Sequence, residues 1–232
     1  MLDPMKPPSY NFVLNNWQLN TPIKKDDGIL TIKTKELDLG YFDKYFYTFS
    51  DGSIAFSCPI NGAHTPNSHY PRCELREKAD NGDWDLLKGI HILETKFKII
   101  KLPKDSGIII GQVHGNDEKK NPQLIKLRWH KNNEIDVQIK SDNDPTKYIN
   151  MVFGKYNLGE EISYKIQLID GKLTVSLKNG QEKFISHSAI FKNPFWNEQK
   201  YYFKTGNYLQ NNGKSEDNSI ICFYQINLEH KY

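Results

Sequence analysis

Short runs of alternating or apolar residues, separated by turn signals, recur along almost the whole chain. A β-strand points successive side chains to opposite faces, so such runs predict strands with one buried face. The dipeptides Asp51-Gly52, Asp170-Gly171 and Asn179-Gly180 tolerate the positive φ of tight turns, and Asp170-Gly171 separates two runs as a hairpin turn does. The predicted strands are Ile29–Lys33, Tyr45–Ser50, Ser53–Ser57, Arg72–Glu77, Ile92–Ile100, Ile108–His114, Leu124–His130, Glu134–Lys140, Tyr148–Phe153, Ile162–Ile169, Lys172–Lys178, Tyr201–Gln210 and Ile220–Leu228.

This pattern predicts an all-β fold, an antiparallel β-sandwich bent into a jelly roll with one concave face open to solvent. Helix is expected only near Asp83–Leu87 and around Ser188–Trp196. No repeat or change in composition divides the 232 residues, so we expect a single domain over residues 1–232. Residues 1–10 are expected to form an extended N-terminal tail.

Composition narrows the choice of partners and location. A formal net charge of +3 does not indicate nucleic acid, although it does not repel a polyanion. No apolar run is long enough for a transmembrane helix, and Met1–Ser9 lacks the layout of a signal peptide. Cys58, Cys73 and Cys222 form neither a disulfide framework nor a metal-ligand spacing, so we expect small buried side chains. The expected protein is a monomer that binds neither nucleic acid nor a membrane.

The predicted strand Arg72-Cys73-Glu74-Leu75-Arg76 carries charges on one face only. Alternation places Arg72, Glu74 and Arg76 together, with Cys73 and Leu75 opposite. Three ionised groups in apolar surroundings would each cost several kcal/mol unless they were paired, roughly the penalty for a desolvated ion. The charged face is therefore predicted to be reachable by solvent and to be a candidate site.

Two further strands add polar groups of the same kind. In Gly111-Gln112-Val113-His114, Gln112 and His114 share a face and Val113 points the other way. In the Tyr201–Gln210 run, Phe203, Thr205, Asn207 and Leu209 share the opposite face, and Gly206 leaves room for a close approach to the backbone. The polar face of that run carries Tyr202, Lys204, Gly206, Tyr208 and Gln210.

These residue types suit β-elimination on a uronic acid polymer. Arg and Gln can stabilise the enolate-like charge that develops when a proton leaves the carbon next to a carboxylate. A neutral His can accept that proton, and a Tyr hydroxyl can give one to the departing glycosidic oxygen. No metal or cofactor is needed. A glycosidase would need two carboxylates astride the bond, and Glu134-Ile135-Asp136 lacks the final acid of the glucanase signature because Gln138 and Ile139 stand there.

Three segments then resemble, in order, the signature motifs of the alginate lyases of polysaccharide lyase family 7. They are Tyr70-Pro71-Arg72-Cys73-Glu74-Leu75-Arg76-Glu77, Gln112-Val113-His114 and the stretch from Tyr202 to Gln210. The loop Gly62-Ala63-His64-Thr65-Pro66-Asn67-Ser68 also resembles that family.

The resemblance implies a jelly roll with a cationic cleft that cleaves alginate, an anionic polysaccharide, and leaves an unsaturated uronate at the non-reducing end. By motif position, Arg72 and Gln112 would neutralise the substrate carboxylate. His114 would be the base and Tyr208 the acid, or Tyr208 both for a syn elimination. The residues expected to bind substrate or shape the cleft are Glu74, Arg76, Lys204, Gln210, Tyr202 and Asn67. Of these, Glu74 and Arg76 are expected mainly to hold each other and the cleft wall.

The chain departs from the family pattern at a few positions. Cys73 replaces a usual Ser or Thr, Thr205 a usual Ala, and His64 a usual Thr. Val113 stands where Ile also occurs, a choice that in the family accompanies mannuronate preference. We therefore expect an endo-acting lyase that favours mannuronate-rich substrate and is secreted or periplasmic, as its substrate is extracellular. The alternatives are a lyase acting on another polyuronate such as glucuronan, a non-catalytic carbohydrate-binding jelly roll, or a glycosidase.

Overall fold

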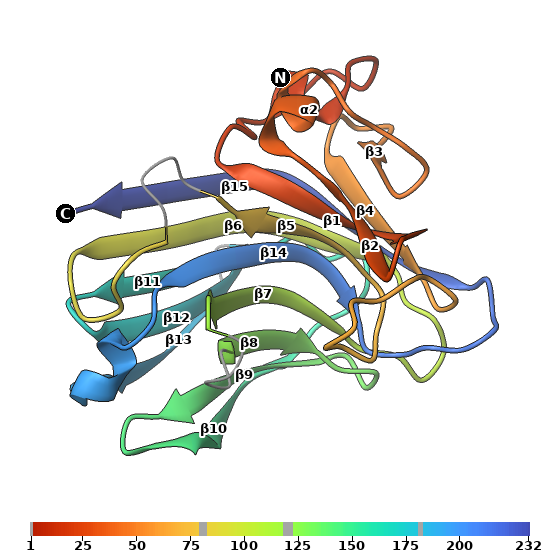
Figure 1. The fold of residues 1–232 in the computed structure, drawn as a ribbon. Helices are drawn as coiled ribbons and strands as arrows, with labels where there is room; N and C mark the ends of the chain where they lie inside the picture. The colour runs from red at the N-terminus through yellow and green to blue at the C-terminus, as the bar shows by residue number, and fades with distance from the viewer. Residues whose placement is uncertain (1, 79–82, 118–122, 181–182) are drawn as a thin grey trace.

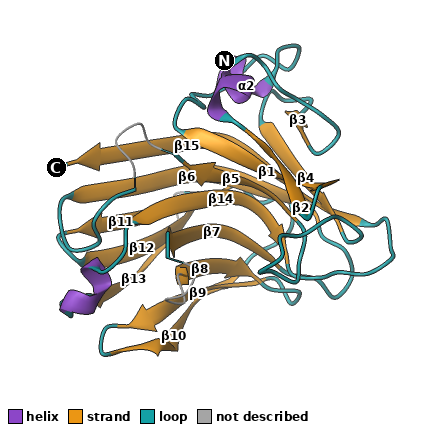
Figure 2. Cartoon of the chain, in the orientation of Figure 1, coloured by secondary structure: helices purple, strands orange, loops and turns teal. Residues whose placement is uncertain are grey.

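Two antiparallel sheets stack face to face in the computed structural model, which describes residues 2–78, 83–117, 123–180 and 183–232 (Figures 1 and 2). The first sheet contains β1 (Trp17–Lys25), β2 (Gly28–Ile32), β5 (Arg72–Glu77), β7 (Ile108–Gly115), β8 (Gln123–Trp129), β9 (Glu134–Ser141), β10 (Asp144–Lys155) and β14 (Tyr201–Leu209). The second contains β3 (Phe46–Thr48), β4 (Ile54–Pro59), β6 (Ile90–Lys101), β11 (Ile162–Ile169), β12 (Lys172–Asn179), β13 (Lys183–Ile190) and β15 (Asn218–Lys231). The predicted all-β sandwich is confirmed.

The strand order brings the three motif strands together. The eight-stranded sheet runs β10-β9-β8-β7-β14-β5-β1-β2, so β14 lies between β7 and β5. In this register Tyr208 lies opposite Arg72, Lys204 lies between Arg76 and Gln112, and Tyr202 lies opposite His114. Residues more than 100 positions apart in sequence therefore form one continuous surface on neighbouring strands.

The other face of the motif strands forms the core between the sheets. Cys73, Leu75, Val113 and Phe203 are fully buried there, as alternation predicts. Thr205 and Asn207 are buried on this side as well, and hydrogen bonds satisfy their polar groups. The Thr205 hydroxyl lies 2.7 Å from the Tyr164 hydroxyl on β11, and Asn207 Nδ2 donates to the carbonyls of Phe56 and Ser219 at 2.9 and 3.1 Å. These bonds join the site sheet to the opposite sheet.

Local turn chemistry is confirmed at the β11–β12 hairpin. Ile169 pairs with Lys172, and the two residues between them have positive φ, 44° at Asp170 and 78° at Gly171. This is the two-residue connection that matches the twist of the flanking strands.

The close approach to the Gly206 backbone that the sequence predicts is made by a neighbouring strand. Its φ is 140°, and a Cβ atom there would lie 2.8 Å from the Cys73 carbonyl oxygen and from Glu74 Cα. The close approach that requires glycine is therefore made by β5, at a register shift between β14 and β7.

Two strands escape the sequence prediction. β1 contains Pro22 between Asn20 and Lys24, where its register with β2 shifts, and a proline within a run argues against a strand unless a bulge accommodates it. β13 was not predicted because it is an edge strand whose outward face carries the exposed apolar residues Phe184 and Ile190, so the expected alternation of apolar and polar residues is absent.

The helices also differ from expectation. The segment Asp83–Leu87 is not helical; Trp84 instead forms a bridge with Tyr201. In the Ser188–Trp196 region, the start belongs to β13 and only the 3-10 turn η2 (Pro194–Asn197) follows. Two short helices were not predicted, α1 (Pro8–Asn11), at the end of the expected tail, and α2 (Thr34–Asp38). Among the described residues, no helix is long and apolar enough to span a bilayer.

Candidate active site

A cavity of about 470 Å³ lies over the motif strands, on the face of the sheet that points away from the core. Arg72, Gln112, His114 and Tyr208, the four residues predicted to carry out chemistry, all line it. The remaining lining residues are Asn20, Thr65, Pro66, Asn67, Ser68, Arg76, Gln123, Lys126, Tyr202 and Lys204. Three strands and one loop thus bring the predicted set into a single site.

Glu74 lies at the centre of the site and is fully buried. Its Oε1 accepts a hydrogen bond from Gln112 Nε2 at 2.5 Å, and its Oε2 accepts one from Lys204 Nζ at 3.1 Å. Arg72 NH1 lies 3.7 Å from the same Oε2. The carboxylate therefore orients one side chain from each of the three motif strands.

The charged face of β5 is more enclosed than alternation alone predicts. Arg72 is only 7% exposed, and its Nε is buried without a partner among the described residues. The residues Thr65 to Ser68 line the same cavity and help to enclose it. The guanidinium carbon of Arg72 lies 3.9 Å from the ring centre of Tyr208, which holds the cation over the predicted acid.

Arg76 does not pair with Glu74, contrary to the expectation that these two neighbours mainly hold each other. Its NH1 donates to the Glu77 carbonyl at 2.8 Å, and its NH2 lies 3.5 Å from Asp83. Its guanidinium carbon lies 3.8 Å from the ring centre of Tyr202. The reason is competition, since Lys204, Gln112 and Arg72 already surround the Glu74 carboxylate.

Tyr202 links Arg76 to His114. The Tyr202 and His114 rings stack with centroids 5.3 Å apart, and the Tyr202 hydroxyl lies 3.0 Å from His114 Nδ1. The same Nδ1 lies 2.7 Å from the Gly115 carbonyl oxygen, which can only accept a hydrogen bond. Nδ1 therefore carries the proton, and the lone pair of the neutral ring is on Nε2.

Burial and nearby cations keep His114 neutral. Burial is the largest cause that lowers the pKa of His114, to about 3, with Lys204, Arg72 and Arg76 acting in the same direction. The Gly115 carbonyl opposes them. At neutral pH the ring is thus an unprotonated acceptor, which a general base must be.

Tyr208 is held in its protonated form. Burial raises the pKa of its hydroxyl, and the nearby Glu74 carboxylate acts in the same direction. Arg72 and hydrogen bonding from Ser68 and Gln210 oppose that rise. A protonated phenol is suited to donate a proton to a leaving oxygen.

Lys204 is the most deeply enclosed cation of the site. Burial is the main cause that lowers its pKa, to about 8, while the Glu74 carboxylate raises it and Arg72 lowers it. Its ammonium therefore depends on Glu74 to remain charged.

Two residues that the sequence analysis singled out, Gln210 and Asp136, lie outside the main cavity. Gln210 lies just beyond β14 and lines a neighbouring hollow with Arg128 and His130; its Nε2 lies 3.3 Å from the Tyr208 carbonyl oxygen. Asp136, from the glucanase-like segment, accepts two hydrogen bonds from Arg128 at 2.8 and 2.6 Å and lies 3.0 Å from His130. Its lone pairs are already used, which agrees with the rejection of that segment as a catalytic signature.

Sequence reasoning missed three side chains of the cavity wall, those of Asn20, Gln123 and Lys126. Gln123 begins β8, one residue before the predicted strand Leu124–His130. Lys126 alternates with core residues on the predicted strand Leu124–His130, so the same face argument could have found it. Asn20 lies on β1, which was not predicted. Among the described residues, no group of His, Cys, Asp or Glu side chains is arranged to hold a metal ion.

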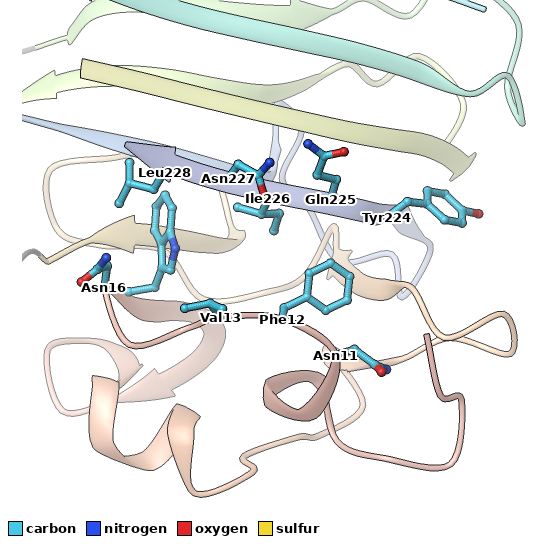
Figure 3. A pocket seen from close by; sticks show the side chains of 10 residues that line it. Asn11, Phe12, Val13, Asn16, Tyr224, Gln225, Ile226, Asn227 and Leu228 are labelled. Atoms are coloured by element: carbon cyan, nitrogen blue, oxygen red, sulfur yellow. The ribbon is translucent and has the colours of Figure 1, made fainter. Parts of the chain in front are cut away.

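A second hollow of about 410 Å³ lies between the N-terminal segment and β15 (Figure 3). Its wall is formed by apolar and amide side chains, including Phe12, Trp17, Gln225 and Asn227, with Tyr224 as its titratable group. The described residues of this wall include neither a cation nor a histidine beside that tyrosine, unlike those of the first cavity, and we do not regard it as a catalytic site.

A model of an alginate lyase family matches residues 12–230. No curated protein sequence matches the chain. Among solved structures, alginate lyase A1-II′, a member of polysaccharide lyase family 7, is 33% identical, with 96% of this chain and 98% of that chain covered and a TM-score of 0.84. A variant of that enzyme in complex with a GGMG substrate is 32% identical, with 97% and 96% covered and a TM-score of 0.85.

An alginate lyase from Pseudomonas aeruginosa is 31% identical, with 94% of this chain and 99% of that chain covered and a TM-score of 0.80. The family match spans nearly the whole chain, and the similar structures are almost completely covered. The chain therefore belongs to the alginate lyases of polysaccharide lyase family 7.

Proposed function

We propose that this polysaccharide lyase cleaves the 1,4-glycosidic bonds of alginate by β-elimination and leaves an unsaturated uronate at the new non-reducing end. The observation that carries this proposal is the convergence of Arg72, Gln112, His114 and Tyr208 on one cavity. A binding surface needs cations and amides, whereas the pairing of a neutral base with a protonated acid serves proton transfer.

Arg72 and Gln112 bind the carboxylate of the uronate that is cleaved. The buried Nε of Arg72 has no hydrogen-bond partner in the described part of the chain. Gln112 uses one amide N–H on Glu74, which leaves a second N–H for the substrate. Hydrogen bonds to the carboxylate become stronger as negative charge moves onto it, so they stabilise the transition state more than the ground state.

The elimination needs one proton acceptor and one proton donor. His114 Nε2 takes the proton from C5, the C4–C5 double bond forms as the C4–oxygen bond breaks, and Tyr208 gives its hydroxyl proton to the leaving oxygen. Where the proton and the leaving oxygen lie on the same side of the sugar, Tyr208 performs both steps. Its hydroxyl proton first moves to His114 Nε2, the phenolate then takes the C5 proton, and the phenol so formed gives that proton to the leaving oxygen. The proton on His114 afterwards returns to Tyr208. Protons and electrons balance without water, metal or cofactor.

Substrate binding raises the basicity of His114. The pKa of the free ring is held low by burial and by Lys204, Arg72 and Arg76. A bound polyanion partly compensates these positive charges, which removes part of the electrostatic opposition to a proton on the ring. The base thus becomes stronger when substrate is present.

The remaining predicted residues shape the cleft. Arg76 and Tyr202 hold the His114 ring, Lys204 adds positive charge, and Asn67 reaches the cavity from the loop. Glu74 acts by orienting Arg72, Gln112 and Lys204. Gln210 acts through its contacts with Tyr208 at the end of β14.

The proposal has three further parts. The enzyme cleaves internal bonds of the polymer, prefers mannuronate-rich substrate, and acts in an extracellular or periplasmic location. Polar residues continue across the sheet beyond the catalytic group, which suits an internal segment of a long polymer. Val113 is fully buried on the core face, so any influence on block preference is indirect, through the position of Gln112 and His114.

The test is to incubate the protein with poly-mannuronate, poly-guluronate and glucuronan and to follow the ultraviolet absorbance of the unsaturated product. We expect absorbance to rise on alginate, faster with poly-mannuronate. A rise in absorbance on glucuronan alone would show that the protein is a lyase for another polyuronate and not for alginate. Alginate binding without product would support a non-catalytic module, and new reducing ends without absorbance would indicate a glycosidase.

A further inference from the structure

Two lysines that the proposed reaction does not use share one aromatic ring beside the catalytic cavity. Lys140 on β9 has its Nζ 4.5 Å from the ring centre of Tyr148 on β10, and Lys126 on β8 has its Nζ 5.9 Å from the same point. Lys126 also lines the cavity. The ring and both ammonium groups therefore continue the wall of the site toward the β10 edge of the sheet.

Neither lysine has an acidic partner among the described residues. Arg128 on the same strand as Lys126 is paired with Asp136, whereas the buried Lys140 donates to the carbonyl oxygen of Pro145. Burial lowers the pKa of Lys140 to about 8, with the charge of Lys126 as a further cause, and burial also lowers the pKa of Lys126. Asp144 acts on Lys140 in the opposite direction, but its carboxylate pairs with Lys147 at 3.2 Å. The two neighbouring ammonium groups thus carry more positive charge than this one carboxylate compensates, and an anion placed between or beside them reduces their repulsion.

The strand register connects this pair to the catalytic group. Lys204 lies opposite Gln112, Gln112 opposite Lys126, Lys126 opposite Gln138, and Gln138 opposite Asn150. Adjacent strands are about 4.8 Å apart, so this row of cations and amides forms a polar track across the sheet. A polymer that follows the track reaches Lys126 and Tyr148 with sugar units beyond the one bound by Arg72 and Gln112.

On the opposite side, the described residues that line the cavity, Asn20 and Thr65 to Ser68, are neutral. There Asn20 on β1 and Thr31 on β2 face each other, with the Thr31 hydroxyl 3.3 Å from Asn20 Oδ1. Both are neutral. The anionic polymer is thus held more strongly on the β8–β10 side of the catalytic group than on the β1–β2 side.

We propose that Lys126, Lys140 and Tyr148 form a distal subsite that binds the carboxylate of a uronate unit outside the cleavage position. Lys126 is half-buried and makes the direct contact, the Tyr148 ring forms the platform, and the buried Lys140 contributes its charge. This proposal rests on the proposed polyuronate lyase activity. It predicts that binding strength depends on chain length because short oligomers do not reach the subsite.

The test compares wild type, Lys126→Gln and Lys140→Met on oligo-mannuronates of increasing length. Lys155→Gln is the matched control because Lys155 is an exposed lysine at the end of β10. For long oligomers we expect KM to rise about tenfold in Lys126→Gln, the loss of one charge-assisted hydrogen bond. KM for the shortest oligomer that is cleaved should change little, and kcat should change little for every oligomer. Lys155→Gln should behave as wild type.

An unchanged KM for long oligomers in Lys126→Gln would overturn the proposal, as would an equal loss on short and long oligomers. Lys126 is partly exposed, so this variant tests the subsite even if the buried Lys140→Met variant fails to fold. Direct calorimetric binding of a long oligo-mannuronate separates the subsite from catalysis. Wild type that binds but forms no product would refute the lyase activity alone, and equal binding by wild type and Lys126→Gln would refute the subsite alone.

Discussion

Glu74 and Glu77 are two buried carboxylates on opposite faces of the same strand, and their surroundings differ in charge. Glu74 faces the cavity with Lys204, Arg72 and the neutral Gln112 around it. Glu77 faces inward and accepts hydrogen bonds from Trp84 Nε1 at 3.1 Å and the Phe203 amide at 2.8 Å, with His230 Nε2 2.8 Å away. The first group has positive charge in excess of its carboxylate, and the second does not.

This difference in surrounding charge distinguishes a carboxylate in a binding site from one that only connects structural elements. In the Glu74 group the carboxylate orients cations whose remaining charge is free to meet an anionic substrate. In the Glu77 group every partner is used to join β5, β14, Trp84 and β15. A buried carboxylate alone therefore says little about function; the charge left over around it is informative.

The Glu77 group extends to a second histidine and defines its protonation. His91 Nε2 lies 2.8 Å from the Lys88 carbonyl and must donate, so in neutral His91 Nδ1 accepts from His230 Nδ1, 2.8 Å away. On its other side, His230 Nε2 lies 2.8 Å from Glu77 Oε1, so the imidazole connects His91 to the carboxylate. Burial is the main cause that lowers the pKa of His91, and His230 acts in the same direction.

The largest expected effect is on turnover when the proton donor or acceptor is removed. Tyr208→Phe and His114→Ala should each lower kcat by about 10²- to 10⁴-fold, the usual contribution of a positioned acid or base. Circular dichroism should show an unchanged fold. Tyr224→Phe is the control because that hydroxyl donates to Asp51 on another face. Near-normal rates for Tyr208→Phe on every substrate would reject Tyr208 as the acid.

The comparison between the two carboxylates is sharpened by Glu74→Gln and Glu77→Gln. Both should lower the free energy of unfolding, by about 3 kcal/mol for Glu74→Gln, because a broken buried pair leaves charges without a partner. Only Glu74→Gln should also reduce kcat strongly, since it releases Arg72, Gln112 and Lys204. Denaturant unfolding and steady-state kinetics measure the two effects, and equal losses of kcat would contradict the distinction.

The low pKa of His114 predicts a pH dependence of stability. In the unfolded chain a histidine titrates near 6.5, whereas in the folded protein the pKa of His114 is about 3. As pH falls, the unfolded chain binds the proton first, so the stability present above pH 6.5 is lost progressively toward pH 3. The free energy of unfolding should fall less over this range in His114→Gln than in wild type. Parallel curves for the two proteins would show that His114 is not held neutral by the fold.

The smallest expected effect concerns the inward group. His230→Leu removes one partner of Glu77 and one of His91, and an unsatisfied buried polar group costs about 1–3 kcal/mol. The free energy of unfolding should fall by that amount while kcat at 25 °C changes little. A loss of kcat as large as that of Glu74→Gln would mean that the two groups are coupled through β5.

Alternation was sufficient to predict the composition of the site but not its internal pairing. Arg72, Gln112, His114 and Tyr208 could be placed on one surface because each strand has a strict two-residue period. Which cation pairs with Glu74 depends on the register between β5, β14 and β7, which no single strand encodes. The interpretation that Arg76 pairs with Glu74 was wrong for this reason.

Much of the fold was predicted from turn chemistry and strand pattern, and the exceptions have physical causes. β1 was missed because Pro22 argues against a strand, and a register shift accommodates it only in the folded sheet. The short helix α2 depends on a local capping bond from the Lys33 amide to Glu36, 2.9 Å long, and five residues give too little periodicity to detect. The burial of Arg72 could not be predicted because it depends on a loop that lines the same cavity.

The most direct test of the central claim is mass spectrometry of the products formed from poly-mannuronate by the wild-type protein. Elimination breaks the glycosidic bond without adding water, so each new non-reducing end should carry a unit lighter by one water than a saturated uronate. Tyr208→Phe should form almost none of this product. Products that all carry the added water of hydrolysis, or unsaturated products formed equally by Tyr208→Phe, would contradict the account.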